Sequence, residues 1–198
     1  MTMDPFYPIF DDVHWLERAL PLGVTFVQMR IKDKDSATTK SMLQDALKIC
    51  TKYEAILVVN DYWETAIEIG ANWCHLGQED LDTADIPGLR KANINLGIST
   101  HDETELQRAL ALEPQYVALG PIWPTILKKM KWAPQGVKKI SKWKSYVGNI
   151  PLVAIGGMTP ERALEARQAG ADIISVVTDI TMHEQPEKRI QEWRAQLS

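Results

Sequence analysis

Short apolar runs alternate with helical patterns along the whole chain, and this alternation most constrains the fold. Runs such as ILVVN (56–60), YVAL (116–119) and LVAI (152–155) are rich in β-branched residues. Each is followed by a stretch whose apolar residues recur at helical spacing, such as the stretch that starts at about Ser36. The pattern repeats about eight times in 198 residues, with strands about 20 to 25 residues apart. It predicts parallel strands joined by helices.

Strands are expected in eight segments of the sequence, namely 6–10, 24–29, 56–60, 72–76, 94–99, 114–120, 151–157 and 172–177. Among the helices that follow them, one is predicted over 86–91 and another after Thr159, which would be its N-cap with Pro160 as first residue. Thr100 and Glu103 have the spacing of a capping box, so we expect Thr100 to begin a helix.

The fold class predicted is α/β, a single (β/α)₈ TIM barrel in which residues 1–198 form one domain. Several strands are apolar on both faces, as in a parallel sheet covered by helices. A doubly wound open sheet is the alternative. That fold would place a glycine-rich turn after the first strand, where this chain has FYPIFDD.

The charge balance favours small-molecule partners. The chain has 26 acidic and 22 basic residues and a formal charge of −4, which does not fit a nucleic-acid binder. We find no signal peptide and no apolar run of about 18 residues, so neither membrane binding nor export is expected. Cys50 and Cys74 fall at apolar positions, as inert thiols in a reducing, cytoplasmic setting would. The oligomeric state stays open.

Polar side chains follow the second strand at alternate positions. Gln28, Arg30 and Lys32 are two residues apart, so an extended chain places them on one side. They could be only the polar side of a strand end. A strand of a closed barrel has a solvated face only at the barrel mouth, where active sites lie, so an anion-binding role is favoured.

Two aspartates follow neighbouring strands. Asp61 comes after Asn60 at the end of the third strand, and Asp80 follows the fourth. Mg²⁺ typically takes one or two carboxylates and completes its coordination with water and phosphate oxygens. We therefore predict Mg²⁺ as cofactor, with Asp61 and Asp80 as ligands. His75 lies inside its strand and is interpreted as a hydrogen-bonded core residue rather than a ligand.

The remaining strand ends offer anion contacts. Ser99 follows the fifth strand, and a loop with three lysines within four residues follows the sixth; its best anion contacts are Thr125 and Lys128. Backbone amides near a helix N-terminus bind phosphate, which favours Gly156 and Gly157 after the seventh strand, and Val177 and Thr178 after the eighth. Two facing anion sites indicate a reaction between two phosphorylated substrates.

Six segments in order resemble the thiamine phosphate synthase (thiamine-phosphate pyrophosphorylase) family. They are QMRIKD (28–33), VNDYW (59–63), HLGQEDL (75–81), LGIST (96–100), LGPIWPT (119–125) and AIGGMTPE (154–161). The resemblance implies a TIM-barrel transferase of thiamine biosynthesis. Such an enzyme joins hydroxymethylpyrimidine pyrophosphate to thiazole phosphate with Mg²⁺, releasing pyrophosphate and forming thiamine phosphate.

Carried over residue by residue, the resemblance implies substrate contacts at Gln28, Arg30, Lys32, Asn60, Ser99, Thr125, Lys128, Gly156, Gly157, Val177 and Thr178. Arg30, Ser99 and Lys128 would act on the leaving diphosphate, and Asp61 and Asp80 would be the metal ligands. Trp63 and Trp123 could stack on a pyrimidine or simply pack.

Two departures from the family pattern keep alternatives open. Leu127 stands where the family's loop has threonine, and Asp179 stands where a small neutral residue is usual. Both favour a non-catalytic sensor that binds thiamine phosphates. A thiazole tautomerase-type relative is the other alternative, but that group lacks the two acidic segments around Asp61 and Asp80.

Overall fold

Eight parallel strands close into a barrel in the computed structural model, which describes residues 3–125 and 132–197. Every strand pairs with its neighbours in the sequence, and β8 returns to pair with β1, where Tyr7 lies opposite Ser175. The predicted (β/α)₈ barrel is confirmed. The strands are β1 (Phe6–Phe10), β2 (Phe26–Met29), β3 (Ile56–Asn60), β4 (Trp73–Leu76), β5 (Asn95–Thr100), β6 (Tyr116–Leu119), β7 (Leu152–Ile155) and β8 (Ile173–Val176).

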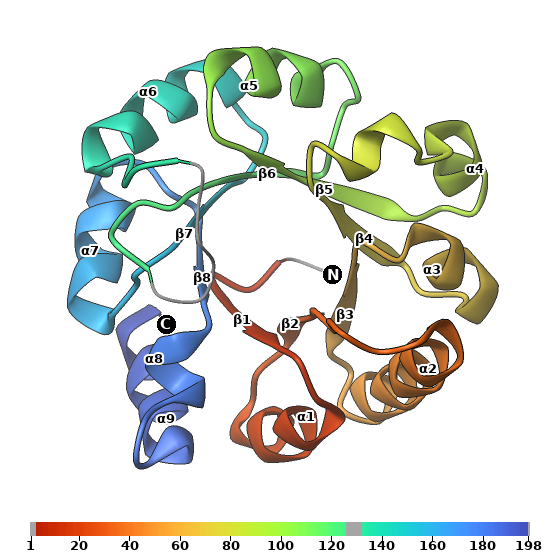
Figure 1. Ribbon diagram of the computed structural model, residues 1–198. Coiled ribbons are helices and arrows are strands. Elements are labelled where there is room, and N and C mark those ends of the chain that lie inside the picture. Colours follow the sequence, from red (N-terminus) through yellow and green to blue (C-terminus); the bar gives the residue numbers. More distant parts are fainter. Residues whose placement is uncertain (1–2, 126–131, 198) are drawn as a thin grey trace.

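Helices surround the strands as an outer ring (Figure 1). They are α1 (Val13–Ala19), α2 (Ser36–Lys52), α3 (Trp63–Ile69), α4 (Ile86–Lys91), α5 (Glu103–Leu110), α6 (Val137–Val147), α7 (Pro160–Gln168), α8 (Thr178–Thr181) and α9 (Pro186–Leu197), with short 3₁₀ turns η1 (Leu20–Leu22) and η2 (Asp80–Asp82). Thr159 caps α7 as predicted, since its side chain accepts from the Arg162 amide.

An aromatic cluster fills the barrel interior near the start of the strands. Tyr7 stacks on Phe26 with ring centroids 4.1 Å apart, and Trp73 lies over Tyr116 at 6.2 Å. All four rings are buried, and each large ring that leaves water contributes substantially to the core. We call these four residues the aromatic plug. Because they fill the N-terminal half of the barrel, open space is left only towards the C-terminal ends of the strands.

The capping box predicted at Thr100 is wrong. Thr100 is the last residue of β5, fully buried, where its hydroxyl donates to the Ala118 carbonyl at 3.0 Å and accepts from Trp143 Nε1 at 2.9 Å. Asp102 caps α5 instead, accepting from the Glu105 amide at 2.9 Å. The threonine-to-glutamate spacing of a capping box therefore also occurs at the end of a strand. Here the Thr100 hydroxyl is the hydrogen-bond acceptor of the buried Trp143 indole, so it does not cap a helix.

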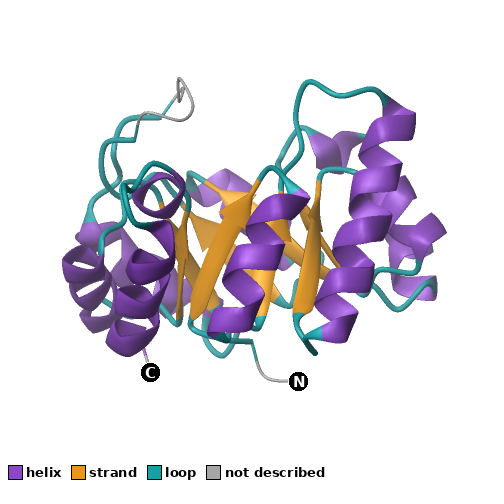
Figure 2. Cartoon of the chain, turned by 90° about the horizontal axis from the view of Figure 1, so that it is seen from below, coloured by secondary structure: helices purple, strands orange, loops and turns teal. Residues whose placement is uncertain are grey.

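The connections that follow the strands gather at one end of the barrel, and both termini lie at the opposite end (Figure 2). None of the helices in the described part of the chain has the length and apolar character needed to span a bilayer. This end of the barrel is where the polar residues that follow the strands come together.

Candidate active site

A cavity of about 790 Å³ opens at the C-terminal ends of the strands. Its size is typical of small-molecule sites. Every residue predicted for the site from the sequence lines it, except Lys128, which lies outside the described residues. These lining residues are Gln28, Arg30, Lys32, Asn60, Asp61, Asp80, Ser99, Thr125, Gly156, Gly157, Val177 and Thr178. Alternation along a strand therefore identified the inward-facing positions.

Asp61 and Asp80 are held at the mouth by local backbone structure. Asp61 has φ of 66°, a left-handed conformation that aspartate tolerates better than most residues. Tight bonds from Tyr62 N to Asn60 O (2.9 Å) and from Trp63 N to Asp61 O (2.8 Å) fix this turn between β3 and α3. Asp80 begins η2, and one of its oxygens accepts from the Gly77 amide at 2.8 Å.

The Asp61 carboxylate lies close enough to Asp80 to affect the ionisation of Asp80. Partial burial raises the pKa of Asp80, and the neighbouring Asp61 carboxylate raises it further; the Gly77 amide and the Lys32 ammonium oppose this. Lys32 forms an ion pair with Asp61. Two repelling carboxylates at an open mouth fit a divalent cation, which would relieve the repulsion.

The acid pair is not part of a larger metal-binding cluster. Over residues 3–125 and 132–197, no group of three or more histidine, cysteine or acidic side chains is arranged to hold a metal ion. Two carboxylates alone suit Mg²⁺, which keeps several waters and takes other oxygens from a substrate phosphate. They do not fit a structural zinc site, which needs four protein ligands.

A chain of hydrogen bonds crosses the cavity floor just above the aromatic plug. Gln28 Nε2 donates to the Tyr7 hydroxyl, which contacts the Tyr116 hydroxyl, and each distance is 2.8 Å. Tyr116 contacts His75 Nδ1, and His75 Nε2 contacts Ser99 Oγ, again at 2.8 Å each. Burial lowers the pKa of His75 to about 4, so the ring is neutral at pH 7. The interpretation of His75 as a hydrogen-bonded core residue is confirmed.

Gly156 and Gly157 lie in the loop that leaves β7, and both have left-handed φ values, 101° and 63°. A Cβ atom at Gly156 would meet Pro121, and one at Gly157 would meet the Pro124 carbonyl. The loop after β6 packs here, with Ile122 N donating to the Ile155 carbonyl at 2.9 Å. These glycines are therefore required by the approach of a neighbouring loop, in addition to any role in binding.

Thr178 begins α8, a short helix that the sequence did not predict, and Val177 precedes it at the cavity wall. The next residue, Asp179, is turned towards α9. Its oxygens accept from Arg189 Nε at 2.7 Å and Nη2 at 3.0 Å, and from Trp193 Nε1 at 2.7 Å. The Asp179 carboxylate is thus committed to a packing role and is not among the residues that line the cavity.

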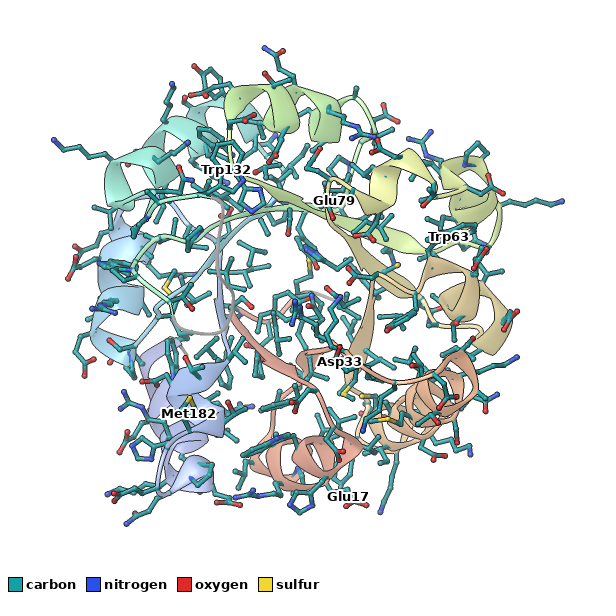
Figure 3. All side chains as sticks on the ribbon, in the orientation of Figure 1. Glu17, Asp33, Trp63, Glu79, Trp132 and Met182 are labelled. Carbon is teal, nitrogen blue, oxygen red and sulfur yellow. The ribbon has the colours of Figure 1, made fainter. Side chains whose placement is uncertain are left out.

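Several lining residues were missed from the sequence, including Tyr7, His101, Glu105, Trp132, Ser175 and Thr181. Within the described part of the chain, neither the buried Ser175 hydroxyl nor the buried Asn60 Nδ2 has a hydrogen-bond partner. Alternation from Ile173 inward would have found Ser175. Glu79 and Trp132 lie near the barrel mouth in Figure 3, whereas Trp63 lies among the outer helices.

Trp63 and Trp123 do not line the cavity, so stacking of either on a ligand there is not supported. Trp63 packs against the core between strands and helices. The Trp123 ring is covered by the Arg162 guanidinium, whose carbon lies 5.5 Å from the ring centroid. Leu127, the other residue that departs from the family pattern, lies outside the described residues.

Comparisons with known proteins agree with this geometry. The family described as "Thiamine monophosphate synthase" matches residues 6–180. The thiamine-phosphate synthase of Rhizobium etli is 52% identical over 195 residues, covering 98% of this chain and 96% of that protein. The Citrobacter koseri protein of the same name is 42% identical over 188 residues, covering 95% and 86%. A solved structure titled thiamine phosphate pyrophosphorylase, from Pyrococcus furiosus, superposes with a TM-score of 0.86 at 27% identity, covering 97% and 94%.

Proposed function

The chain belongs to the thiamine monophosphate synthase family, and from this premise we propose that its cavity joins hydroxymethylpyrimidine pyrophosphate to thiazole phosphate, forming thiamine phosphate and pyrophosphate. The protein is a transferase of thiamine biosynthesis. The observation that carries the site assignment is the convergence of Asp61, Asp80, Arg30 and Lys32 on one cavity. In this proposal the two cationic side chains bind the departing diphosphate, and the two carboxylates would hold the metal ion that accompanies it.

The reaction needs a stabilised leaving group more than a base. The bond between the exocyclic methylene carbon of the pyrimidine and the diphosphate oxygen breaks, and the diphosphate keeps the electron pair. The electron-rich pyrimidine spreads the resulting positive charge, and the thiazole nitrogen then donates its lone pair to the carbon. No proton has to be removed from that nitrogen. The step therefore depends on positioning of the two substrates and on electrostatic stabilisation of the departing diphosphate.

The residues of the chain have separate tasks in this proposal. Arg30 offers a fixed fork of donors to the diphosphate, and Lys32 adds a mobile charge beside Asp61. Ser99 supplies a hydroxyl at the cavity wall. Asp61 and Asp80 would hold Mg²⁺, which supplies positive charge to the diphosphate oxygens. Lys128, which lies outside the described residues, is expected from the family resemblance to contribute a further cation.

The pyrimidine and the thiazole phosphate would occupy the remaining space. Buried Asn60 Nδ2, which has no partner among residues 3–125 and 132–197, is a donor available to a polar ring. Gly156, Gly157 and Thr178 lie on the β7–β8 side, where barrels commonly bind phosphate. This assignment puts the two anions on opposite sides of the cavity, so their repulsion is reduced while the reacting carbon and nitrogen meet between them.

A single-turnover experiment tests the proposal. Excess purified protein is mixed with both substrates and Mg²⁺, and thiamine phosphate and pyrophosphate are quantified over time. We expect equal amounts of the two products, and none when either substrate is omitted. Asp61→Asn should lose turnover, whereas Asp82→Asn, at an exposed acid paired with Arg108, should keep it.

Tight binding of both substrates without product would instead support a sensor of thiamine phosphates. One of the two features that favoured that alternative is weakened, because Asp179 pairs with α9 rather than facing the cavity. The chain also has the two acidic segments that the tautomerase-type relatives lack.

A further inference from the structure

The hydrogen bonds of the cavity floor form one unbranched chain of side chains. It runs from Gln28 through Tyr7, Tyr116 and His75 to Ser99, and each of its four links is 2.8 Å long. Gln28, Tyr7, Tyr116 and His75 are buried, and both ends of the chain line the cavity. Two of the links, Tyr7–Tyr116 and Tyr116–His75, join strands that are not neighbours in the barrel. We call this set the floor relay.

The protons of the floor relay can be counted from one end. Gln28 Nε2 can only donate, so the Tyr7 oxygen accepts there. Either tyrosine could donate in the Tyr7–Tyr116 bond, and the order in which Tyr7 donates to Tyr116 gives every tyrosine proton of the relay a partner within it. Tyr116 in turn has one proton left to give, and it goes to His75 Nδ1. Burial raises the pKa of both tyrosines, so each keeps its proton across the working range of pH.

Because His75 Nδ1 accepts, the single proton of the neutral ring must be on Nε2, which faces Ser99 Oγ. The serine oxygen then accepts from the imidazole. Its own hydroxyl proton is left without a partner in the relay. With the opposite order, Ser99 would donate to His75 and present only lone pairs to the cavity, which would repel an anion.

We propose that Tyr7, Tyr116 and His75 are positioning residues that hold His75 in its Nε2–H form and thereby turn the Ser99 hydroxyl proton towards a substrate oxyanion. The inference rests on the proposed function, in which Ser99 contacts the diphosphate. It goes beyond that function by assigning a task to three further residues. His75 contacts Ser99 directly, and Tyr116 and Tyr7 act on Ser99 through His75. It also explains why two tyrosine hydroxyls are retained inside an otherwise apolar plug.

The histidine tautomer tests the relay without any activity measurement. In protein labelled with ¹⁵N histidine, two-bond ¹H–¹⁵N correlations identify which ring nitrogen of each histidine carries the proton. The His75 signals are assigned by their loss in His75→Asn. We expect Nε2–H for His75. An Nδ1–H ring in the wild-type protein overturns the relay, even if that protein makes thiamine phosphate. Absence of product with an Nε2–H ring overturns the proposed function and leaves the relay standing.

Tyr116→Phe tests the mechanism, with Tyr146→Phe as the matched control. Tyr146 is about half exposed on α6, so its loss should change neither rate nor tautomer. Tyr116→Phe removes the donor to His75 Nδ1, and we expect mixed tautomers and a fall in kcat of about ten- to a hundredfold, as for one lost bond to a charged group. KM for the thiazole phosphate should stay unchanged.

A double-mutant cycle separates this role from a general loss of packing. If Tyr116 acts through Ser99, adding Tyr116→Phe to Ser99→Ala should lower kcat no further. A full additional loss in the Ser99→Ala background would overturn the relay. Should Tyr116→Phe fail to fold, the tautomer of His75 in the wild-type protein decides the matter alone.

Discussion

Replacing Asp80 with asparagine should make the metal-free protein more stable while it removes turnover. The Asp80 carboxylate is partly buried and faces the Asp61 carboxylate, and both effects raise its pKa. Asparagine has almost the same shape and can still accept from the Gly77 amide. The substitution therefore removes a repulsive charge without leaving a cavity.

Two opposing contributions set the size of the stability change. Like charges 4 Å apart repel by about 1 kcal/mol in water and about 4 kcal/mol near a protein surface. The bond from Gly77 weakens by about 1 kcal/mol when its acceptor becomes neutral. These contributions leave a net gain of about 0–3 kcal/mol, and we expect a value near the middle, about 1–2 kcal/mol, because the mouth is only partly open to solvent. For a chain of this length, that corresponds to a rise in Tm of roughly 2–8 °C.

The pH dependence of the gain follows from the direction of the pKa shift. A carboxyl whose pKa is raised by folding costs stability only when it is charged. Below about pH 4, the ordinary value for aspartate, Asp80 is protonated in both states and costs nothing. The advantage of Asp80→Asn should therefore appear as pH rises above that value and be complete above the raised pKa of the folded state.

Thermal unfolding in a chelating buffer at pH 7 and at pH 4 checks the predicted gain in stability. Product formation at saturating Mg²⁺ checks the predicted loss of turnover. Asp82→Asn is the matched control, because Asp82 is exposed and pairs with Arg108. Because Asp80 is proposed to hold Mg²⁺, Asp80→Asn should also raise the Mg²⁺ concentration needed for product formation. A variant that melts below wild type at pH 7 without metal, and that still turns over normally, would refute the reasoning.

Three further substitutions probe the cavity and the residues packed around it. Gly97→Ala should destabilise the protein by about 1–3 kcal/mol in denaturant unfolding, because its methyl group would overlap the Tyr116 ring; unchanged stability would contradict this contact. Asp179→Ala should cost about 2–4 kcal/mol, since it removes the acceptor of Trp193 Nε1, yet leave both KM values unchanged; tighter phosphate binding would mean that the carboxylate faces the site. Ser175→Ala should keep or raise stability, because that buried hydroxyl has no partner in the described part of the chain, but weaken substrate binding about two- to tenfold in titration.

The sequence predicted the barrel and the composition of its mouth because both follow from local periodicity. A strand that enters a closed barrel alternates between inside and outside, so Gln28, Arg30 and Lys32 had to share a side. Neighbouring strands end at the same edge, which brought Asp61 and Asp80 together. Neither inference required knowledge of a distant contact.

Features that depend on distant partners were not predictable in this way. The hydroxyls of Tyr7 and Tyr116 meet across 109 residues of sequence, and nothing near either residue indicates the other. Thr100 has the spacing of a helix cap, but the Trp143 indole, 43 residues later, takes its hydroxyl. Asp179 similarly faces α9 because of Trp193, not because of any signal beside it.

The open end of the barrel contains groups that the fold alone does not satisfy. Asp61 has a left-handed backbone, Asp80 faces a like charge, and Asn60 Nδ2 and Ser175 Oγ are buried with no partner among the residues that the structure describes. A metal ion would neutralise the facing carboxylates, and a polar substrate would supply partners for the buried amide and hydroxyl; only the backbone strain at Asp61 would remain. The free energy of binding these ligands should therefore add to the free energy of unfolding of the protein. A substrate at 100 times its Kd would add about 2.7 kcal/mol to the free energy of unfolding. The cost of these groups in the empty cavity is thus the physical reason why the filled cavity should bind its ligands tightly.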